Sequence, residues 1–257
     1  FMSVGAKAGG FAALLRVLVV ALPTLTVAGA TAAAWVDTLA IVAALTMILG
    51  NFVAIAQSNI KRMLAYSSIA HAGYILMAVA AAGHPGVGDQ GVEGALVYLL
   101  AYAFTNLGAF AIVIAIERND GTGVTLDSFK GLGRQRPVLA LLMAFFMFSL
   151  TGIPLTAGFV GKWYVFWSAI NAGLGGLAVI GVLTAVVGAF YYLRIVVLMF
   201  LQDGDADTAM KPLPGSLWAA LTVSALGTLI FGVLPMWMTD LAAGVNLADM
   251  ARLLLGG

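Results

Sequence analysis

The chain contains no cysteine and very little charge. Without a thiol it cannot form a disulfide, a thiolate metal site, an iron–sulfur cluster or a cysteine nucleophile. The presence of only two histidines argues against a histidine-rich metal or haem site. Charged residues make up 9% of the 257 residues, against about 25% in soluble domains, and 62% are hydrophobic. The composition therefore indicates an integral membrane protein, and the net charge of +1 says nothing about its partners.

Long apolar runs fill most of the sequence, without the alternation that is typical of strands. Seven of them reach the roughly 20 residues that a helix needs to cross a bilayer. They lie near 3–28, 36–56, 60–82, 92–116, 138–171, 175–201 and 215–240. We therefore predict an all-α, polytopic membrane helix bundle of about seven transmembrane helices, with 1–257 as a single transmembrane domain. Because Phe1 is no initiator and no signal segment precedes the first run, we expect a fragment cut at its N-terminal side.

The run 138–171 is too long for one straight helix, and it contains Gly152 and Pro154 near its middle. Proline removes a backbone donor and clashes with the preceding turn, so the helix should break there. Broken helices at membrane depth are tolerated where they line protein or a water-filled cavity. We expect a discontinuous helix, with half-helices over 138–150 and 156–171 on either side of the break.

Basic residues are distributed unevenly between the two sets of loops. One set holds seven and the other holds Arg252 alone. The seven are Lys61, Arg62, Arg118, Lys130, Arg134, Arg136 and Lys211. Since cytoplasmic loops carry the excess of lysine and arginine, we predict that the first residues and the loops 57–62, 117–136 and 202–214 are cytoplasmic. All eleven acids lie in loops or at span edges, so the basic residues inside the spans have no acid in their own helix interior.

Lys162 lies about two turns beyond the predicted break, near the bilayer midplane at about 1.5 Å per residue. A charge at this depth costs a few kcal/mol or more, so an intramembrane lysine indicates a functional site. Burial disfavours the charged form of an amine, which allows such a group to gain and lose a proton. Its depth argues against a lysine that snorkels to the interface. We therefore predict a proton-translocating role for Lys162.

Lys7 leaves two interpretations open. It lies inside the first apolar run, but the start of its helix is not known from the sequence. It is either a second proton-carrying lysine or a lysine that snorkels near the cytoplasmic face. The arginines inside spans, Arg16 and Arg194, keep their charge and cannot carry protons. We expect them to anchor acids on neighbouring helices or, for Arg194, to reach toward the cytoplasmic face.

His71 lies near the middle of the run 60–82 and shares one helical face with Ser67 and Tyr74, at spacings of four and three. Histidine titrates near neutral pH and can pass a proton between its two ring nitrogens. A structural histidine that is hydrogen-bonded to a facing helix explains the same position. The pattern makes His71 a candidate for proton translocation, supported by Ser67 and Tyr74, with the structural alternative left open.

Two segments resemble a known family. The stretch from Ser58 to His71, SNIKRMLAYSSIAH, resembles the antiporter-like subunits of the proton-pumping NADH–quinone oxidoreductase, respiratory complex I. Gly152-Ile153-Pro154, followed by GFVGKWY over 158–164, is similar to the discontinuous helix of that family, in the version found in subunit N. The order of the spans and the loop spacings fit the family from end to end. The resemblance implies that this chain is the C-terminal half of such a subunit.

The resemblance also implies a mechanism and a setting. Lys7 matches the central lysine of the family, and Lys162 matches the terminal lysine on the exit side. The chain would then couple electron transfer from NADH to quinone, as a translocase subunit, to proton pumping. It would hold no cofactor, because NADH, FMN, Fe–S clusters and quinone are handled by other subunits. Its partners would be other membrane subunits of complex I, the lipid bilayer and protons, without nucleic acid. The location would be multi-pass in the inner membrane of a bacterium.

Two other functions are compatible with the sequence. A subunit of a multisubunit cation/proton antiporter shares the fold and the lysines, although the Gly-Lys-Trp-Tyr sequence at 161–164 disfavours it. A purely structural membrane scaffold is the third possibility. It would predict that neutral residues replace both Lys7 and Lys162 without effect.

Overall fold

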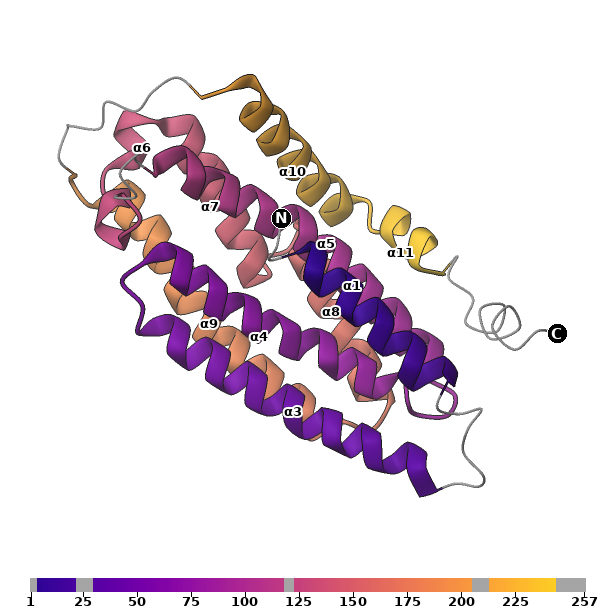
Figure 1. Cartoon of the computed structure of the whole chain (residues 1–257). Helices are drawn as coiled ribbons and strands as arrows, with labels where there is room; N and C mark the ends of the chain where they lie inside the picture. Colours follow the sequence, from indigo (N-terminus) through magenta and orange to yellow (C-terminus); the bar gives the residue numbers. More distant parts are fainter. Residues whose placement is uncertain (1–3, 22–29, 118–122, 205–212, 244–257) are drawn as a thin grey trace.

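The computed structural model describes residues 4–21, 30–117, 123–204 and 213–243 (Figure 1). Apart from an isolated bridge between Asn59 and Thr125, the regular elements in these ranges are helices. They are α1 (Gly5–Leu15), the π-helical turn η1 (Arg16–Ala21), α3 (Ala30–Ile55), α4 (Ile60–Ala81), α5 (Gly88–Ile116), the 3-10 turn η2 (Leu126–Phe129), α6 (Leu132–Gln135), α7 (Pro137–Thr151), α8 (Ala157–Asn171), α9 (Gly175–Leu201), α10 (Gly215–Val233) and α11 (Met236–Ala243). The prediction of an all-α helix bundle is confirmed for this part of the chain.

Five helices of the described ranges are long and apolar enough to cross a membrane: α3, α4, α5, α9 and α10. The first predicted run, 3–28, corresponds to α1 and η1 as far as Ala21, and the rest of it lies outside the described residues. The predicted span 215–240 differs, because α10 ends at Val233 and α11 begins at Met236. Pro235 lies between them, and proline both ends a helix and restricts the residue before it.

The predicted break in 138–171 is confirmed. Helix α7 ends at Thr151, and α8 begins at Ala157, with Pro154 in the non-helical segment between them. Gly152 ends α7 in the left-handed conformation, with φ +93°. The N–H groups of Gly152 and Ile153 both donate to the carbonyl of Phe148 at 3.0 Å, which closes the helix end. The two half-helices therefore meet inside the bundle and leave backbone carbonyls of α7 available to other donors.

Helices α4 and α5 form the centre of the bundle. Helix α3 packs against α4 and α9, whereas α8 and α10 pack against α5. Figure 1 shows α3 and α10 along opposite edges of the bundle. The outer face of α3 exposes large apolar side chains, among them Ile41, Leu49 and Phe52 at 58–62% exposure. An apolar outer face of this kind suits contact with lipid chains. The polar side chains in the middle of α4 and α5, such as His71 and Thr105, are buried inside the bundle.

The described parts of the three loops that carry most of the basic residues lie at one end of the bundle (Figure 1). The N–H of Ile60 donates to the carbonyl of Val124 at 2.9 Å, and the N–H of Leu126 donates to the carbonyl of Ser58 at 2.8 Å. Ion pairs between these segments and the helix ends are Lys61–Glu117 and Arg134–Asp203. The described parts of 57–62, 117–136 and 202–214 therefore share one end of the bundle, while 118–122 and 205–212 lie outside the described residues.

Candidate functional site

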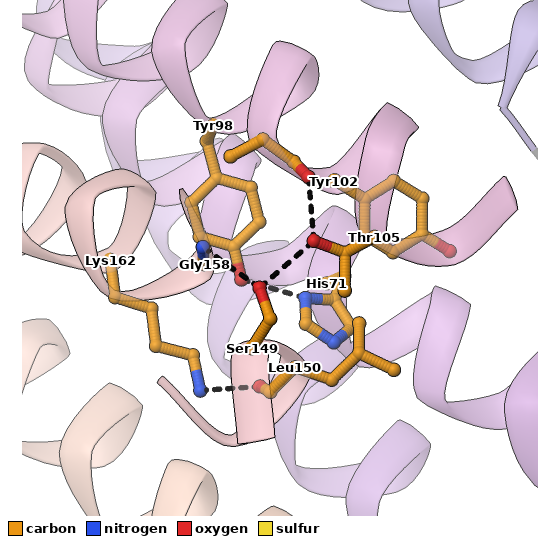
Figure 2. Close-up of a pocket in the computed structure, with 9 residues that line it drawn as sticks. His71, Tyr98, Tyr102, Thr105, Ser149, Leu150, Gly158 and Lys162 are labelled. Atoms are coloured by element: carbon orange, nitrogen blue, oxygen red, sulfur yellow. Dashed lines mark hydrogen bonds between the residues drawn. The ribbon is translucent and has the colours of Figure 1, made fainter. Parts of the chain in front are cut away.

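Lys162 is buried, with 8% of its surface exposed, and its amine lies at the end of α7. Its Nζ donates to the carbonyl of Leu150 at 2.9 Å (Figure 2) and to that of Thr151 at 2.6 Å. A helix that continued through the break would give the Leu150 carbonyl to the N–H of residue 154, but proline has none. The carboxyl end of a helix also attracts positive charge. The break therefore supplies the acceptors that hold the lysine.

Gly152 allows this approach. Its φ of +93° is a backbone conformation that residues with a side chain rarely adopt. A Cβ at this position would lie 2.9 Å from Cδ of Lys162, inside normal contact distance. Both the turn and the close approach of the lysine therefore require glycine.

His71 is buried between α5 and α9. Its Nδ1 is 2.7 Å from the hydroxyl of Tyr98, and its Nε2 is 2.9 Å from the hydroxyl of Tyr192. Tyr192 is also hydrogen-bonded to Ser67. A neutral imidazole has one donor and one acceptor nitrogen, and a tyrosine hydroxyl can serve either. Both tautomers of His71 therefore fit the same surroundings, which is what a group that passes protons requires.

The amine of Lys7 lies beside the middle of α4. Its Nζ donates to the carbonyl of Ser68 at 2.6 Å and to the Ser68 hydroxyl at 2.8 Å. It also lies over the ring of Tyr102, 4.3 Å from the centroid. Because Ser68 is one turn from His71 on α4, the amine of Lys7 lies against α4 within one helical turn of His71.

Tyr74 lies on the Lys162 side of His71. The Nζ of Lys162 is 5.6 Å from the centroid of the Tyr74 ring. The Tyr74 hydroxyl is 3.3 Å from the hydroxyl of Thr184 and 3.4 Å from the amide nitrogen of Asn51. The candidate residues Ser67, His71 and Tyr74 thus face one polar region, as their helical spacing predicted.

A small cavity joins His71 to Lys162. Its volume is about 10 Å³, which is roughly the space that one water molecule occupies by the same measure. Its lining also includes Tyr98, Thr105 and Ser149 (Figure 2). The Thr105 and Ser149 hydroxyls are 2.9 Å apart, and the N–H of Gly158 donates to Ser149 at 3.1 Å. The cavity therefore offers about the space of one water molecule between the two titratable groups.

The sequence did not identify the tyrosines that surround His71. Tyr98 and Tyr102 come from α5, and Tyr192 comes from α9. One signal was present, because Tyr98, Tyr102 and Thr105 are spaced four and three residues apart and so share a helical face. For Tyr192 no such signal exists, since its role depends on how α9 packs against α4.

Arg16 and Arg194 are exposed and form no ion pair within the described ranges. The expectation that they anchor acids on neighbouring helices is therefore not met by the residues that the structure describes. Arg194 has an electrostatic effect on Asp127, which lies at the end of the bundle where the basic residues of the loops gather (the basic end). Lys130, whose ammonium is 2.7 Å from Asp127, lowers the pKa of that carboxyl, and the charge of Arg194 acts in the same direction.

Comparison with known proteins places these features in a family. The family model described as NADH:quinone oxidoreductase/Mrp antiporter, TM, matches residues 1–188. A protein named NADH-quinone oxidoreductase subunit N 2 from Roseiflexus castenholzii is 48% identical over 100% of this chain and 49% of its own length. A subunit N from Trichlorobacter lovleyi is 47% identical over 94% of this chain and 47% of its own length. The chain spans about half the length of these curated relatives.

Solved structures show the same fold. A chain of respiratory complex I from Thermus thermophilus with bound aureothin is 36% identical, with a TM-score of 0.69, over 80% of this chain and 46% of its own. A chain of the Mrp complex from Dietzia sp. DQ12-45-1b is 24% identical, with a TM-score of 0.72, over 84% of this chain and 48% of its own. The second likeness concerns the fold alone.

Proposed function

Because the chain belongs to the NADH:quinone oxidoreductase/Mrp antiporter family of transmembrane proteins, we propose that it is the C-terminal half of subunit N of a proton-pumping NADH–quinone oxidoreductase. In this role it moves protons through the membrane, between Lys7 and Lys162 by way of His71. The subunit serves an enzyme complex, and its own contribution is translocation.

The observation that carries the proposal is the convergence of three titratable groups from separate helices. Lys7 comes from α1, His71 from α4 and Lys162 from α8. The Tyr102 ring contacts both Lys7 and His71, and the cavity connects His71 to Lys162. Charged groups in the membrane interior are costly, so their assembly around one histidine supports a proton relay over a structural role.

The geometry supports proton transfer from His71 either to Tyr98 through Nδ1 or to Tyr192 through Nε2. When one ring nitrogen accepts a proton, the other can release its proton to a hydrogen-bonded tyrosine. Tyr98, which contacts Nδ1, also lines the cavity that holds Lys162. A proton that leaves this side of His71 reaches the lysine amine through one water. The carbonyls of Leu150 and Thr151 then hold the resulting ammonium until it gives the proton up.

The redox chemistry belongs to other subunits in this proposal. Within the described ranges, no three His, Asp or Glu side chains gather to hold a metal ion. NADH, FMN, Fe–S clusters and quinone would be bound elsewhere in the complex, and the partners of this chain would be other membrane subunits, lipid and protons. We propose the inner membrane of a bacterium as its location, with the basic end of the bundle in the cytoplasm.

The Mrp antiporter alternative shares the family model and the fold. The curated relatives that are 43–48% identical carry the name of subunit N, which favours the oxidoreductase. The two functions differ in what drives the protons. A complex that pumps protons on addition of NADH supports the oxidoreductase, whereas proton movement driven by a cation gradient alone supports the antiporter.

The test of the proposed function is neutral replacement of the lysines in the complete complex. Lys162→Ala and Lys7→Ala should each lower proton pumping and the quinone reduction coupled to it, because alanine cannot hold a proton. NADH oxidation with an artificial acceptor should survive, since that chemistry lies on other subunits. Lys130→Ala, which removes a half-buried, ion-paired lysine of the basic end, is the matched control and should pump normally. Normal pumping by assembled Lys162→Ala would support the scaffold interpretation instead.

A further inference from the structure

Lys7 is surrounded by neutral partners. Its ammonium contacts two oxygens of Ser68 and the ring of Tyr102. The ion pairs of the described ranges involve Lys61, Lys130 and Arg134, so no described carboxylate pairs with Lys7. The face of an aromatic ring carries negative charge density and attracts a cation within about 6 Å of its centroid. Tyr102 is only 4% exposed, and this attraction is strongest where water is excluded.

The same ring contacts His71. The centroids of the Tyr102 and His71 rings are 4.9 Å apart, with an angle of 39° between the planes. Tyr102 is therefore in contact with both groups that exchange a proton at this end of the proposed relay. A change in the ring acts on the position of Lys7 relative to His71 and on the stability of the charged amine.

A looser version of this arrangement occurs at the other lysine. Lys162 has two carbonyl acceptors and the ring of Tyr74, whose centroid is 5.6 Å from its Nζ. Tyr74 in turn contacts His71 edge-on, with centroids 5.9 Å apart. Because the attraction falls with distance, the tyrosine ring should matter more for Lys7 than for Lys162.

We propose that Tyr102 is a positioning residue for Lys7: its ring face binds the protonated amine and holds it beside His71. The inference rests on the proposed function and names a residue that supports it. When Lys7 is protonated, the ring attracts it; when Lys7 gives up the proton, that attraction is lost and the neutral amine is released. The electron density of the ring, more than its hydroxyl, then sets how well this end of the relay works.

The experiment replaces residue 102 in the complete complex and measures NADH-driven proton pumping. Tyr102→Phe keeps the ring face and should pump nearly as well as the native protein. Mono-, di- and trifluorinated phenylalanine at 102 withdraw electron density stepwise with little change in ring size. Pumping should fall with each fluorine, by about threefold or more for the trifluorinated ring. The same series at position 74 is the matched control and should show a smaller slope, because Tyr74 lies farther from its lysine.

Each outcome decides a separate question. A flat fluorination series at 102, with Lys7→Ala still defective, would show that Tyr102 only packs, and the inference would be overturned while the proposed function stands. Loss of pumping in Tyr102→Phe would assign the role to the hydroxyl and overturn the ring-face inference. Normal pumping in Lys7→Ala would overturn the proposed function itself.

Discussion

At the scale of single residues, each intramembrane lysine is held by dipoles. Lys162 contacts backbone carbonyls at a helix end, and Lys7 contacts the carbonyl and hydroxyl of one serine. An ion pair with a carboxylate would strongly favour the charged form. Dipoles and ring faces stabilise the ammonium less, so the amine remains able to release its proton. Neutral surroundings therefore suit a lysine that changes charge in each cycle, as the proposed relay requires.

A charge-preserving replacement tests this point. Lys162→Arg should impair pumping strongly, although it keeps the positive charge, because the guanidinium does not release its proton at physiological pH. The measurement is proton pumping by the assembled complex, alongside NADH oxidation with an artificial acceptor. Lys130→Arg at the exposed basic end is the control. Full pumping by Lys162→Arg would mean that the position needs charge but no proton transfer.

At the scale of elements, the discontinuous helix creates the site. The end of α7 supplies two carbonyls, the break keeps them free, and α8 returns Lys162 to them. Sequence alone located this break, because an overlong apolar run that contains Pro154 is a local signal. Sequence alone also suggested a single span over 215–240, and there the effect of Pro235 was missed. Pro154 and Pro235 both interrupt an apolar run, and of these two it is Pro154 that lies next to the carbonyls that hold the buried Lys162.

The glycine that ends α7 should be functionally sensitive. Gly152→Ala forces a side chain into a left-handed conformation, at a cost of about 1–2 kcal/mol, and places Cβ against Lys162. Gly173, just beyond the end of α8, also has positive φ but nothing within 4 Å of its missing Cβ. Thermal unfolding should therefore show similar destabilisation for Gly152→Ala and Gly173→Ala. Pumping should drop severalfold in the first variant alone, and equal pumping in both would contradict this account of the break.

At the scale of the whole molecule, the basic loops collect at one end of the bundle, and the polar centre is enclosed by α4, α5, α8 and α9. The orientation of that end follows from the distribution of charge. Because the native sequence has no cysteine, a single introduced cysteine is the only thiol in this chain. The topology can therefore be measured without background from the chain itself.

Labelling from outside intact cells should distinguish the two ends. Asp127→Cys lies in the basic loop, where the native side chain is 78% exposed, and it should resist a membrane-impermeant maleimide. Pro85→Cys lies in the exposed turn between α4 and α5 at the opposite end, and it should react. After the cells are opened, both should be labelled. Ready reaction of Asp127→Cys in intact cells would show that the orientation is inverted.

The sequence predicted the fold and the titratable groups better than the contacts between them. Lys162 and His71 stand out because polar groups are rare in apolar runs. Lys7 remained ambiguous, since its depth depends on how α1 packs against α4. Tyr102 and Tyr192 look like ordinary interior aromatics until the packing brings them to His71. Residues that are unusual for their surroundings are visible in a sequence, whereas residues that matter through their neighbours require the structure.

The most direct test of the relay is to replace His71 with a residue that keeps hydrogen bonds but passes no proton. His71→Gln should lower NADH-driven proton pumping at least about tenfold, since a positioned acid–base group contributes roughly 10²–10⁴-fold to proton transfer. His84→Gln changes the other histidine of the chain, in the turn after α4, and should pump normally. Loss of pumping in His71→Gln alone, with NADH oxidation by an artificial acceptor intact, is the predicted result. Pumping at the native rate by an assembled His71→Gln complex would contradict the central claim.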